Sequence, residues 1–155
     1  GLSSLKIEEK PSFEKYKRDA ITSFVKNASK RIKAYQPDCI VSAAVKPNVS
    51  NAIFTFGQEW DLWLKNGYID WAVPMNYTRE NSVIEKNIRS MLNNIPKHYL
   101  KQIVMGIGVY NQDARSSGQK IYKTVKNDFG GVSIFSYTVF KEKPSYAKQI
   151  KKYLN

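Results

Sequence analysis

The stretch "GYIDWAVPMNY", residues 67–77, combines a helix end, a strand and a polar site in one short run. Trp60 and Trp63 precede it in a segment that we expect to be helical. Gly67 suits the end of that helix, because glycine adopts the left-handed backbone of a helix C-terminus without strain. The mostly apolar residues 68–75 then predict a buried strand.

Three polar residues in this stretch receive different roles. Asp70 lies at the start of the predicted strand, and we expect it to hold that end of the strand by hydrogen bonds. Asn76 and Tyr77 follow the strand. Ligands of parallel α/β folds bind at the carboxyl ends of strands, so this pair is a candidate binding site.

The same alternation of helix and strand continues on both sides. Apolar residues at steps of three and four predict a long amphipathic helix from Phe13 to Tyr35. Ser12 is its expected N-cap, and Pro37 lies just beyond its end. Short apolar runs predict strands at residues 39–45, 68–75, 102–110 and 132–140.

Further helices fill the spaces between these strands. Ser82 and Glu85 have the spacing of a capping box, and Pro96 stops the helix that they begin. Gly130 and Gly131 are expected to close the next helix. Apolar residues between positions 146 and 154 predict a last helix.

Strands that recur about every thirty residues, each followed by a helix, predict an α/β fold with a parallel sheet of about four strands. Two architectures satisfy this pattern: an open doubly wound sheet, or βα repeats that form half of a (β/α)₈ barrel. Gly106 and Gly108 lie inside a strand, so no glycine-rich phosphate loop follows any strand. The sequence therefore argues against a nucleotide site.

The composition is that of one globular domain. The chain has 155 residues, of which 42% are apolar and 25% charged, and no apolar run approaches the length of about 20 residues that spans a membrane. The formal net charge is +12. The lysines are spread along the polar faces of predicted helices, so we expect a solvated basic surface rather than a nucleic-acid site. They include Lys15, Lys17, Lys26, Lys30, Lys33, Lys86, Lys120, Lys123, Lys126, Lys148, Lys151 and Lys152.

All four predicted strands end in amide, hydroxyl, aromatic or basic groups. Such groups suit a sugar, which offers flat C–H patches for stacking and many hydroxyls for hydrogen bonds. The expected partner is therefore a poly- or oligosaccharide. The candidate substrate-binding residues are Lys46, Asn48, Asn76, Tyr77, Arg79, Tyr110, Asn111, Ser136 and Tyr137.

Hydrolysis of a glycosidic bond needs two carboxylates. Glu80 and Asp113 fall just beyond strand ends, and Glu59 follows the first strand, so these three are the candidate catalytic acids. They form no obvious pair in the sequence. His98 and Cys39 are single and far apart, so we expect no metal site and no cofactor.

Several of these segments, in order, resemble the C-terminal half of the glycosyl hydrolase-like 10 family, formerly a domain of unknown function. The similarity spans nearly the whole chain. The tryptophan-containing helix, the Gly-aromatic-Ile-Asp-aromatic run and the Pro-x-x-Tyr motif are its most specific part. The similar segments are "SFEKYKRDAITSFVKNASKRIKAYQPDCIVSAAVKP", "FGQEWDLWLKNGYIDWAVPMNYTRE", "GIGVYN" and "GGVSIFSYTVF".

The resemblance implies a (β/α)₈ barrel glycosidase of the cell envelope, in a family whose related members are cell-envelope proteins, lipoproteins among them, that act on peptidoglycan-type glycans. An acid-rich strand should then precede the long first helix, and it does not occur in residues 1–155. We therefore expect a fragment of a longer chain that is inactive alone, with the main catalytic carboxylate in the other half. Met75 and Asn76 also stand where the family commonly has a glutamine.

Two further hypotheses remain beside a hydrolase. A non-catalytic carbohydrate-binding or interaction module would keep the same residues without the chemistry, and a nucleic-acid binder is favoured by the net charge alone. A half barrel would also expose two unpaired strand edges, so we expect a homodimer that pairs them. The segment "GLSSLKIEEKP" has no apolar core of a signal peptide, so an extracytoplasmic location follows from the resemblance alone.

Overall fold

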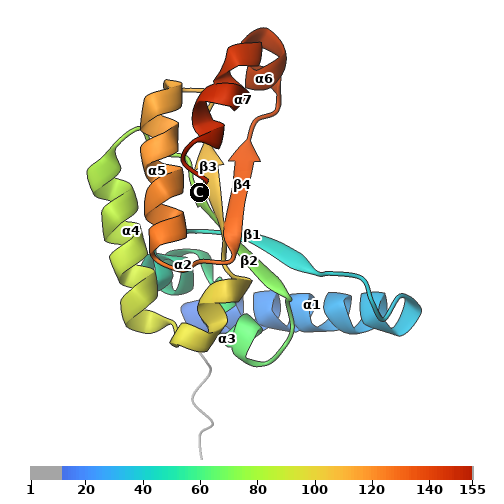
Figure 1. The fold of residues 1–155 in the computed structure, drawn as a ribbon. Coiled ribbons are helices and arrows are strands. Elements are labelled where there is room, and N and C mark those ends of the chain that lie inside the picture. Colours follow the sequence, from blue (N-terminus) through green and yellow to red (C-terminus); the bar gives the residue numbers. More distant parts are fainter. Residues whose placement is uncertain (1–11, 155) are drawn as a thin grey trace, which may run out of the picture.

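Four parallel strands form a single sheet in the computed structural model, which describes residues 12–154 (Figure 1). Helices separate successive strands, so the predicted α/β fold is confirmed. The elements in chain order are α1 (Phe13–Tyr35), β1 (Ser42–Val45), α2 (Val49–Phe56), α3 (Trp60–Lys65), β2 (Trp71–Asn76), α4 (Asn81–Asn94), the 3₁₀ helix η1 (Lys97–Gln102), β3 (Val104–Gly108), α5 (Ala114–Lys126), β4 (Gly131–Phe135), α6 (Thr138–Glu142) and α7 (Pro144–Lys151).

The strands lie side by side in chain order, β1-β2-β3-β4. A doubly wound sheet reverses direction at a switch point, so its strand order is not sequential. The observed order therefore excludes that alternative and agrees with four consecutive units of a (β/α)₈ barrel. The register pairs Asn76 with Ile107 and Gly108 with Phe135, which brings the carboxyl ends of β2, β3 and β4 together.

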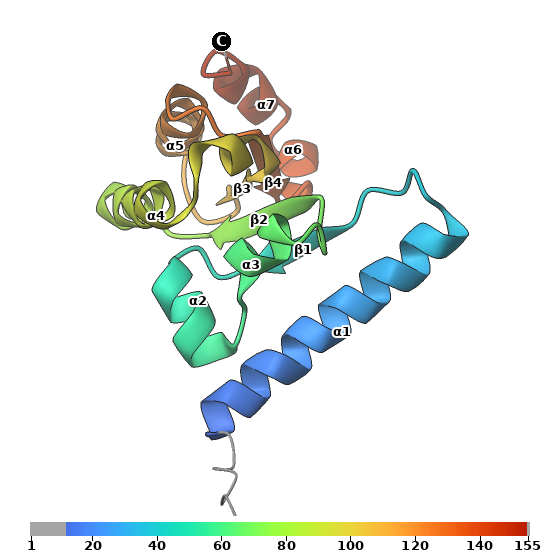
Figure 2. The same ribbon diagram turned by 90° about the horizontal axis from the view of Figure 1, so that it is seen from below.

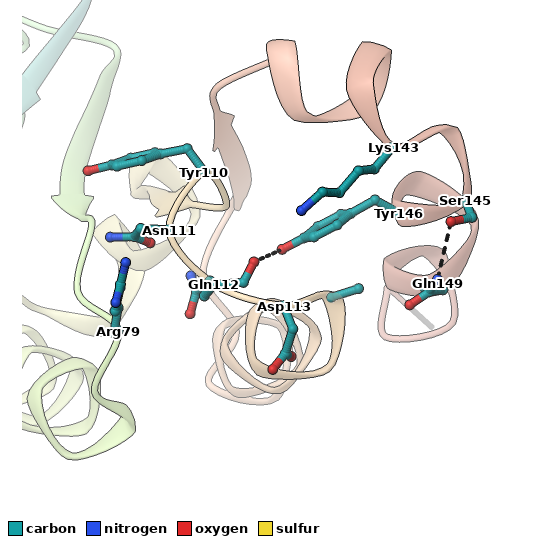
Figure 3. A pocket seen from close by; sticks show the side chains of 10 residues that line it. Arg79, Tyr110, Asn111, Gln112, Asp113, Lys143, Ser145, Tyr146 and Gln149 are labelled. Carbon is teal, nitrogen blue, oxygen red and sulfur yellow. Dashed lines mark hydrogen bonds between the residues drawn. The ribbon is translucent and has the colours of Figure 1, made fainter.

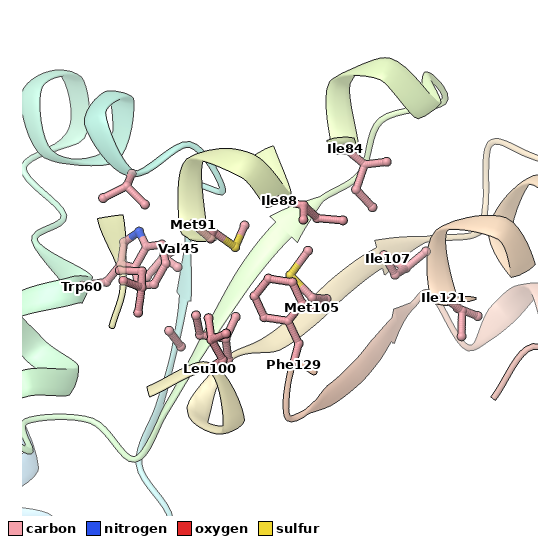
Figure 4. Close-up of a cluster of buried hydrophobic side chains, with 14 of the residues drawn as sticks. Val45, Trp60, Ile84, Ile88, Met91, Leu100, Met105, Ile107, Ile121 and Phe129 are labelled. Atoms are coloured by element: carbon pink, nitrogen blue, oxygen red, sulfur yellow. The ribbon is translucent and has the colours of Figure 1, made fainter. Parts of the chain in front are cut away.

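One face of this sheet is covered by helices and holds the core. Pro74, Met105 and Ile107 are buried on this face. Helices α4 and α5 pack over the strands there, with Ile84, Ile88 and Ile121 beside Met105 and Ile107 (Figure 4). Trp60 and Trp63 close the core near β1, and both are almost fully buried. Burial of such side chains stabilises a fold by about 1.5–3 kcal/mol each, so this layer dominates the stability.

The other face of the sheet is open. Ser42, Ala44 and Ser133 are exposed there, and Trp71 and Phe135 keep 41% and 50% of their surface in solvent. Parallel sheets are normally covered on both faces, as the apolar character of the predicted strands also suggested. Within residues 12–154 only one face is covered.

Helix α1 lies beside α2 and α3 rather than over the sheet (Figure 2). Its inner side packs Ile21 against the core, and the Trp63 indole donates to Thr22 Oγ1 at 2.8 Å. Its outer side is different: Phe13 and Phe24 are each more than 70% exposed. The helix therefore has a second apolar stripe with no covering layer in the part of the chain that the structure describes.

Local signals in the sequence are confirmed at the ends of elements. Ser12 Oγ accepts the Lys15 N–H at 3.3 Å and caps α1. Gly67 has φ +65° just after α3, as expected for a helix end. Asp70 Oδ2 accepts the Val41 N–H at 2.7 Å and also pairs with Lys33 at 2.8 Å, so it holds the strand start as predicted.

Two predicted helix boundaries are wrong. Helix α4 begins at Asn81 with Glu80 as N-cap residue, and Glu85 pairs with Lys123 of α5 instead of completing a capping box with Ser82. Helix α5 ends at Lys126, before the predicted glycines. In both places a tertiary contact or a turn replaces the local motif.

The strands are also shorter than predicted. The fourth strand differs most in length from its prediction. It was expected over residues 132–140, but β4 ends at Phe135 and residues 138–142 form α6. The β-branched and aromatic residues of "TVF" favour strand by propensity, but packing of Val139 and Phe140 on the core overrides that preference. Helix α2 and the 3₁₀ helix η1 were not separately predicted.

Candidate functional site

Three aromatic rings lie together at the carboxyl ends of β2, β3 and β4. The rings of Tyr77 and Phe135 are stacked, with centroids 5.1 Å apart and planes inclined by 14°. The Tyr110 ring meets the Phe135 ring edge to face at 5.8 Å. Half of the surface of Tyr110 and of Phe135 is exposed. We call Tyr77, Tyr110 and Phe135 the aromatic platform, because it presents ring surface to solvent at the ligand-binding edge of a parallel sheet.

Two glycines of β3 make room for this platform. Gly106 and Gly108 lie on the open face of the sheet, whereas Ile107 between them points into the core. A Cβ atom at position 108 would lie 3.1 Å from Tyr77 Cα and 3.3 Å from Tyr110 Cε1, closer than ordinary packing contacts. The Gly-Ile-Gly sequence therefore lets both tyrosines lie close to the strand.

A hollow of about 370 Å³ opens beside the platform, between the ends of β1 and β2. Lys46 lines it, with its Nζ atom 4.5 Å from the centre of the Phe56 ring. Asn48 instead caps α2 by accepting the Asn51 N–H at 2.9 Å. The other lining residues are Pro47, Met75, Asn76, Tyr77, Thr78, Val83 and Asn87.

Asn76 borders this hollow but is almost fully buried. Its Oδ1 atom accepts the Asn87 Nδ2–H at 2.9 Å, and its own Nδ2 donates to Pro74 O at 3.2 Å. The bond from Asn87 joins the end of β2 to α4. Of the two adjacent residues Asn76 and Tyr77, Tyr77 thus belongs to the platform, whereas Asn76 faces the helices.

A larger hollow, of about 510 Å³, lies on the other side of the platform (Figure 3). We call it the basic hollow, because Arg79 and Lys143 line it from opposite sides. Asn111 approaches from the platform side and donates to Tyr77 O at 3.4 Å. The full lining comprises Arg79, Tyr110, Asn111, Gln112, Asp113, Ala114, Lys143, Ser145, Tyr146 and Gln149.

The wall of the basic hollow is fixed by Tyr146 of α7. Its hydroxyl lies 2.8 Å from Ser117 Oγ and donates to Gln112 O at 3.0 Å. Burial raises the pKa of this hydroxyl above its ordinary value, so it stays protonated and able to donate at neutral pH. Helix α7 is thereby attached to α5 and to the loop after β3.

Lys120 is fully buried beneath the same loops. Its Nζ atom donates to Thr78 O at 2.6 Å, to Arg79 O at 2.9 Å and to the Gln112 side chain. The expectation that this lysine belongs to a solvated helix face is therefore wrong. Burial lowers the pKa of Lys120, while the nearby carboxylate of Asp113 acts in the opposite direction.

Ser136 and Tyr137 lie beyond the platform, in the turn between β4 and α6. Tyr137 is 68% exposed, and its ring meets Phe140 edge to face at 6.2 Å. The Lys141 ammonium lies 5.8 Å from the centre of the Tyr137 ring. This residue could extend the platform toward α6, although it does not pack with the other three rings.

The candidate acids do not converge on one point. Glu59 is bound to α1, 3.5 Å from the Arg18 guanidinium and 3.1 Å from the Thr22 hydroxyl. Glu80 is exposed at the start of α4, where its backbone N–H donates to Thr78 Oγ1. Their catalytic roles remain predictions.

Asp113 is the one candidate acid that lines the basic hollow among residues 12–154. Its Oδ1 atom accepts the Ser116 N–H at 2.7 Å and caps α5. The hydrogen bonds from Ser116 lower the pKa of the Asp113 carboxyl, so it is ionised at neutral pH. An ionised carboxylate suits a base or nucleophile better than a general acid, whose pKa must be raised.

Sequence reasoning missed several members of the site. Phe135 was passed over in favour of its neighbours, although the period of two along β4 could have placed it on the open face with Ser133. Lys143 carries no distinctive local signal. Tyr146 was expected only as an apolar residue of the last helix, because only the tertiary fold brings α7 to the end of β3.

Other classes of site find no support in the described part of the chain. Within residues 12–154 no group of three or more histidines, cysteines, aspartates or glutamates is placed to hold a metal ion. None of the described helices is both long and apolar enough to span a membrane.

Two comparisons with known proteins found no match. No family model matches the chain, and no curated protein matches it.

Proposed function

We propose that this chain is the sugar-binding half of a glycoside hydrolase-type (β/α)₈ barrel, and that four further βα units supply the main catalytic carboxylate. The aromatic platform is the observation that carries the proposal. Stacked and edge-on rings that remain half exposed offer flat apolar surface to the C–H face of a sugar ring.

Polar groups around the platform supply the hydrogen bonds that a sugar requires. Arg79 and Asn111 lie on one side and Lys46 on the other. Burial, together with the neighbouring Tyr110, raises the pKa of the Tyr77 hydroxyl, so Tyr77 keeps its proton at neutral pH. These groups include both donors and acceptors, as an array of sugar hydroxyls demands.

A second candidate is a non-catalytic carbohydrate-binding module. It is favoured by the positions of the acids, because Glu59 binds α1 and Asp113 caps α5. The two candidates share the platform and differ in whether a partner half barrel restores hydrolysis. Binding is therefore the first property to test.

The test is isothermal titration of the chain with neutral hexasaccharides of glucose, N-acetylglucosamine and galactose. We expect at least one to bind, and we expect Phe135→Ala and Tyr110→Ala each to weaken it by about tenfold, or about 1.4 kcal/mol. Phe54→Ala and Tyr35→Ala are matched controls, because they remove exposed rings on α2 and α1. Equal loss in the controls, or a failure of every hexasaccharide, neutral or charged, to bind, would contradict the proposal.

A further inference from the structure

The basic hollow carries more positive charge than a neutral sugar needs. Arg79 comes from the loop after β2 and Lys143 from the turn between α6 and α7, and both line the hollow (Figure 3). Within residues 12–154 neither forms an ion pair with a carboxylate. Two positively charged side chains on opposite walls therefore line one hollow, and no carboxylate of the described residues pairs with either.

The single acid of the hollow forms an ion pair with neither of them. The carboxylate of Asp113 accepts the Ser116 N–H and is used to cap α5. Lys120 below the hollow is also engaged, since its Nζ atom donates to three oxygen atoms of the surrounding loops. Arg79 and Lys143 are thus the charged groups that remain for a ligand.

Uncharged groups in the hollow point to a polyhydroxylated ligand rather than a small inorganic anion. Asn111 lines the hollow, and its buried Oδ1 atom has no hydrogen-bond partner among the described residues, so a rotation of this amide would offer the acceptor to a sugar hydroxyl. Gln149 contributes an amide on the opposite wall. Tyr110 belongs both to the hollow and to the aromatic platform, so one oligosaccharide can contact both.

We infer that the basic hollow is a subsite for a sugar that bears a carboxylate, and that the ligand is therefore an acidic oligosaccharide. This inference rests on the proposed function. A planar guanidinium such as that of Arg79 matches a carboxylate with two parallel hydrogen bonds, while Lys143 adds a second charge from across the hollow. The volume of about 510 Å³ accommodates one sugar ring together with its substituent.

The experiment compares acidic oligosaccharides with neutral counterparts of the same length. Hexamers of galacturonic, glucuronic and mannuronic acid are titrated into the chain, together with the same hexamers after reduction of each carboxyl to a primary alcohol. We expect at least one acidic hexamer to bind about tenfold more tightly than its reduced form. The double variant R79Q/K143Q should abolish this difference, so that it binds the acidic hexamer and its reduced form with equal affinity.

The matched control is K65Q/K97Q, which also removes two positive charges. Lys65 ends α3 and Lys97 begins η1, and both are exposed and precede strands, so they lie at the opposite edge of the sheet. Loss of the acidic preference in this control would overturn the inference, because net charge would then explain it. Circular dichroism checks that each variant folds, and all four replaced side chains are exposed.

The remaining outcomes separate the two proposals. Equal binding of acidic and reduced hexamers, still weakened by Phe135→Ala, overturns the acidic subsite and leaves the proposed function intact. Failure of acidic and neutral hexamers alike to bind overturns both. Tighter binding of a single-stranded oligonucleotide of equal charge, lost in R79Q/K143Q, would identify the hollow as a phosphate site and overturn the inference.

Discussion

Lys120 shows at the scale of one residue how burial changes the role of a charged side chain. It lies on a helix among other lysines, and its sequence neighbourhood does not distinguish it from Lys123 or Lys126. Yet its Nζ atom binds carbonyl oxygens of Thr78 and Arg79 and is enclosed by protein. The loops that carry the candidate site are therefore joined by a buried cation rather than by backbone pairing.

Asp70 provides a prediction about pH. Its pKa is lowered in the folded chain from the ordinary value of 3.8, first by the hydrogen bond from Lys33 and then by that from the Val41 N–H. A lowered pKa stabilises the fold above the ordinary value, and this contribution disappears as the pH falls through the folded-state pKa. Asp70→Asn should therefore cost stability at neutral pH and little in acid.

We expect a loss of about 1 kcal/mol at about pH 7, because the carboxylate is partly exposed and solvent screens the pair. The difference from the unchanged protein should be smaller at about pH 3, because the contribution is lost as the pH falls below 3.8 toward the folded-state pKa. Urea unfolding at the two pH values measures it. Asp38→Asn, which changes an exposed carboxylate nearby, is the control. A difference that is undiminished in acid would refute this account of Asp70.

At the scale of elements, the junction between η1 and β4 depends on a close backbone approach. The N–H of Gly130 donates to Leu100 O and Ile103 O, both at 3.0 Å. A Cβ atom at this position would overlap the carbonyl oxygen of Lys101. The glycine is therefore required by packing between two segments, and its φ is not in the left-handed region.

Gly130→Ala should destabilise the fold by about 2 kcal/mol, the cost of forcing a methyl group into a filled space. Gly131→Ala is a neighbouring control, because nothing lies within 4 Å of a Cβ atom there. Thermal unfolding of the two variants should separate them clearly. Equal melting temperatures would show that η1 moves away without cost.

The platform is an element-scale feature that the sequence indicated only in part. Tyr77 and Tyr110 were identified because both follow apolar strands. Phe135 was not, because the predicted strand ran on to residue 140 and placed the strand end too late. Since propensity reflects local preference and α6 forms by packing on the core, the boundary could not be found from the local residues alone.

At the scale of the whole molecule, the sheet formed by residues 12–154 is open at both edges. Within the described residues β1 and β4 each have a neighbour on one side only, and the face that carries Trp71 and Phe135 is uncovered. Unpaired strand edges tend to pair with another chain. Two copies related by a two-fold axis would place β4 of each beside β1 of the other and close an eight-stranded barrel.

We therefore expect self-association in sedimentation velocity. The net charge of +12 opposes it, so the dimer fraction should rise with added salt, which screens the repulsion. Ala44→Lys should prevent association, because it adds a charge to the open face that closure would bury. Ala147→Lys on exposed α7 is the control. Monomers at every salt concentration would rule out this pairing.

The sequence by itself determined the alternation of helices and strands, the cap at Ser12 and the role of Asp70. These features depend on the period of apolar residues and on groups a few positions apart. The candidate binding residues at strand ends followed from the same alternation, because parallel strands bring their carboxyl ends to one edge. The half-barrel strand order, in contrast, was one of two arrangements that this pattern allowed.

Only the tertiary structure decided which face of the sheet is covered and where the site's side chains point. It turned Asn76 toward Asn87, buried Lys120 and brought Tyr146 of α7 to the loop after β3. Each of these contacts joins residues from different elements of the fold or from the loops between them. Burial and pairing depend on those distant neighbours, whereas sequence periodicity reports only what lies within a few residues.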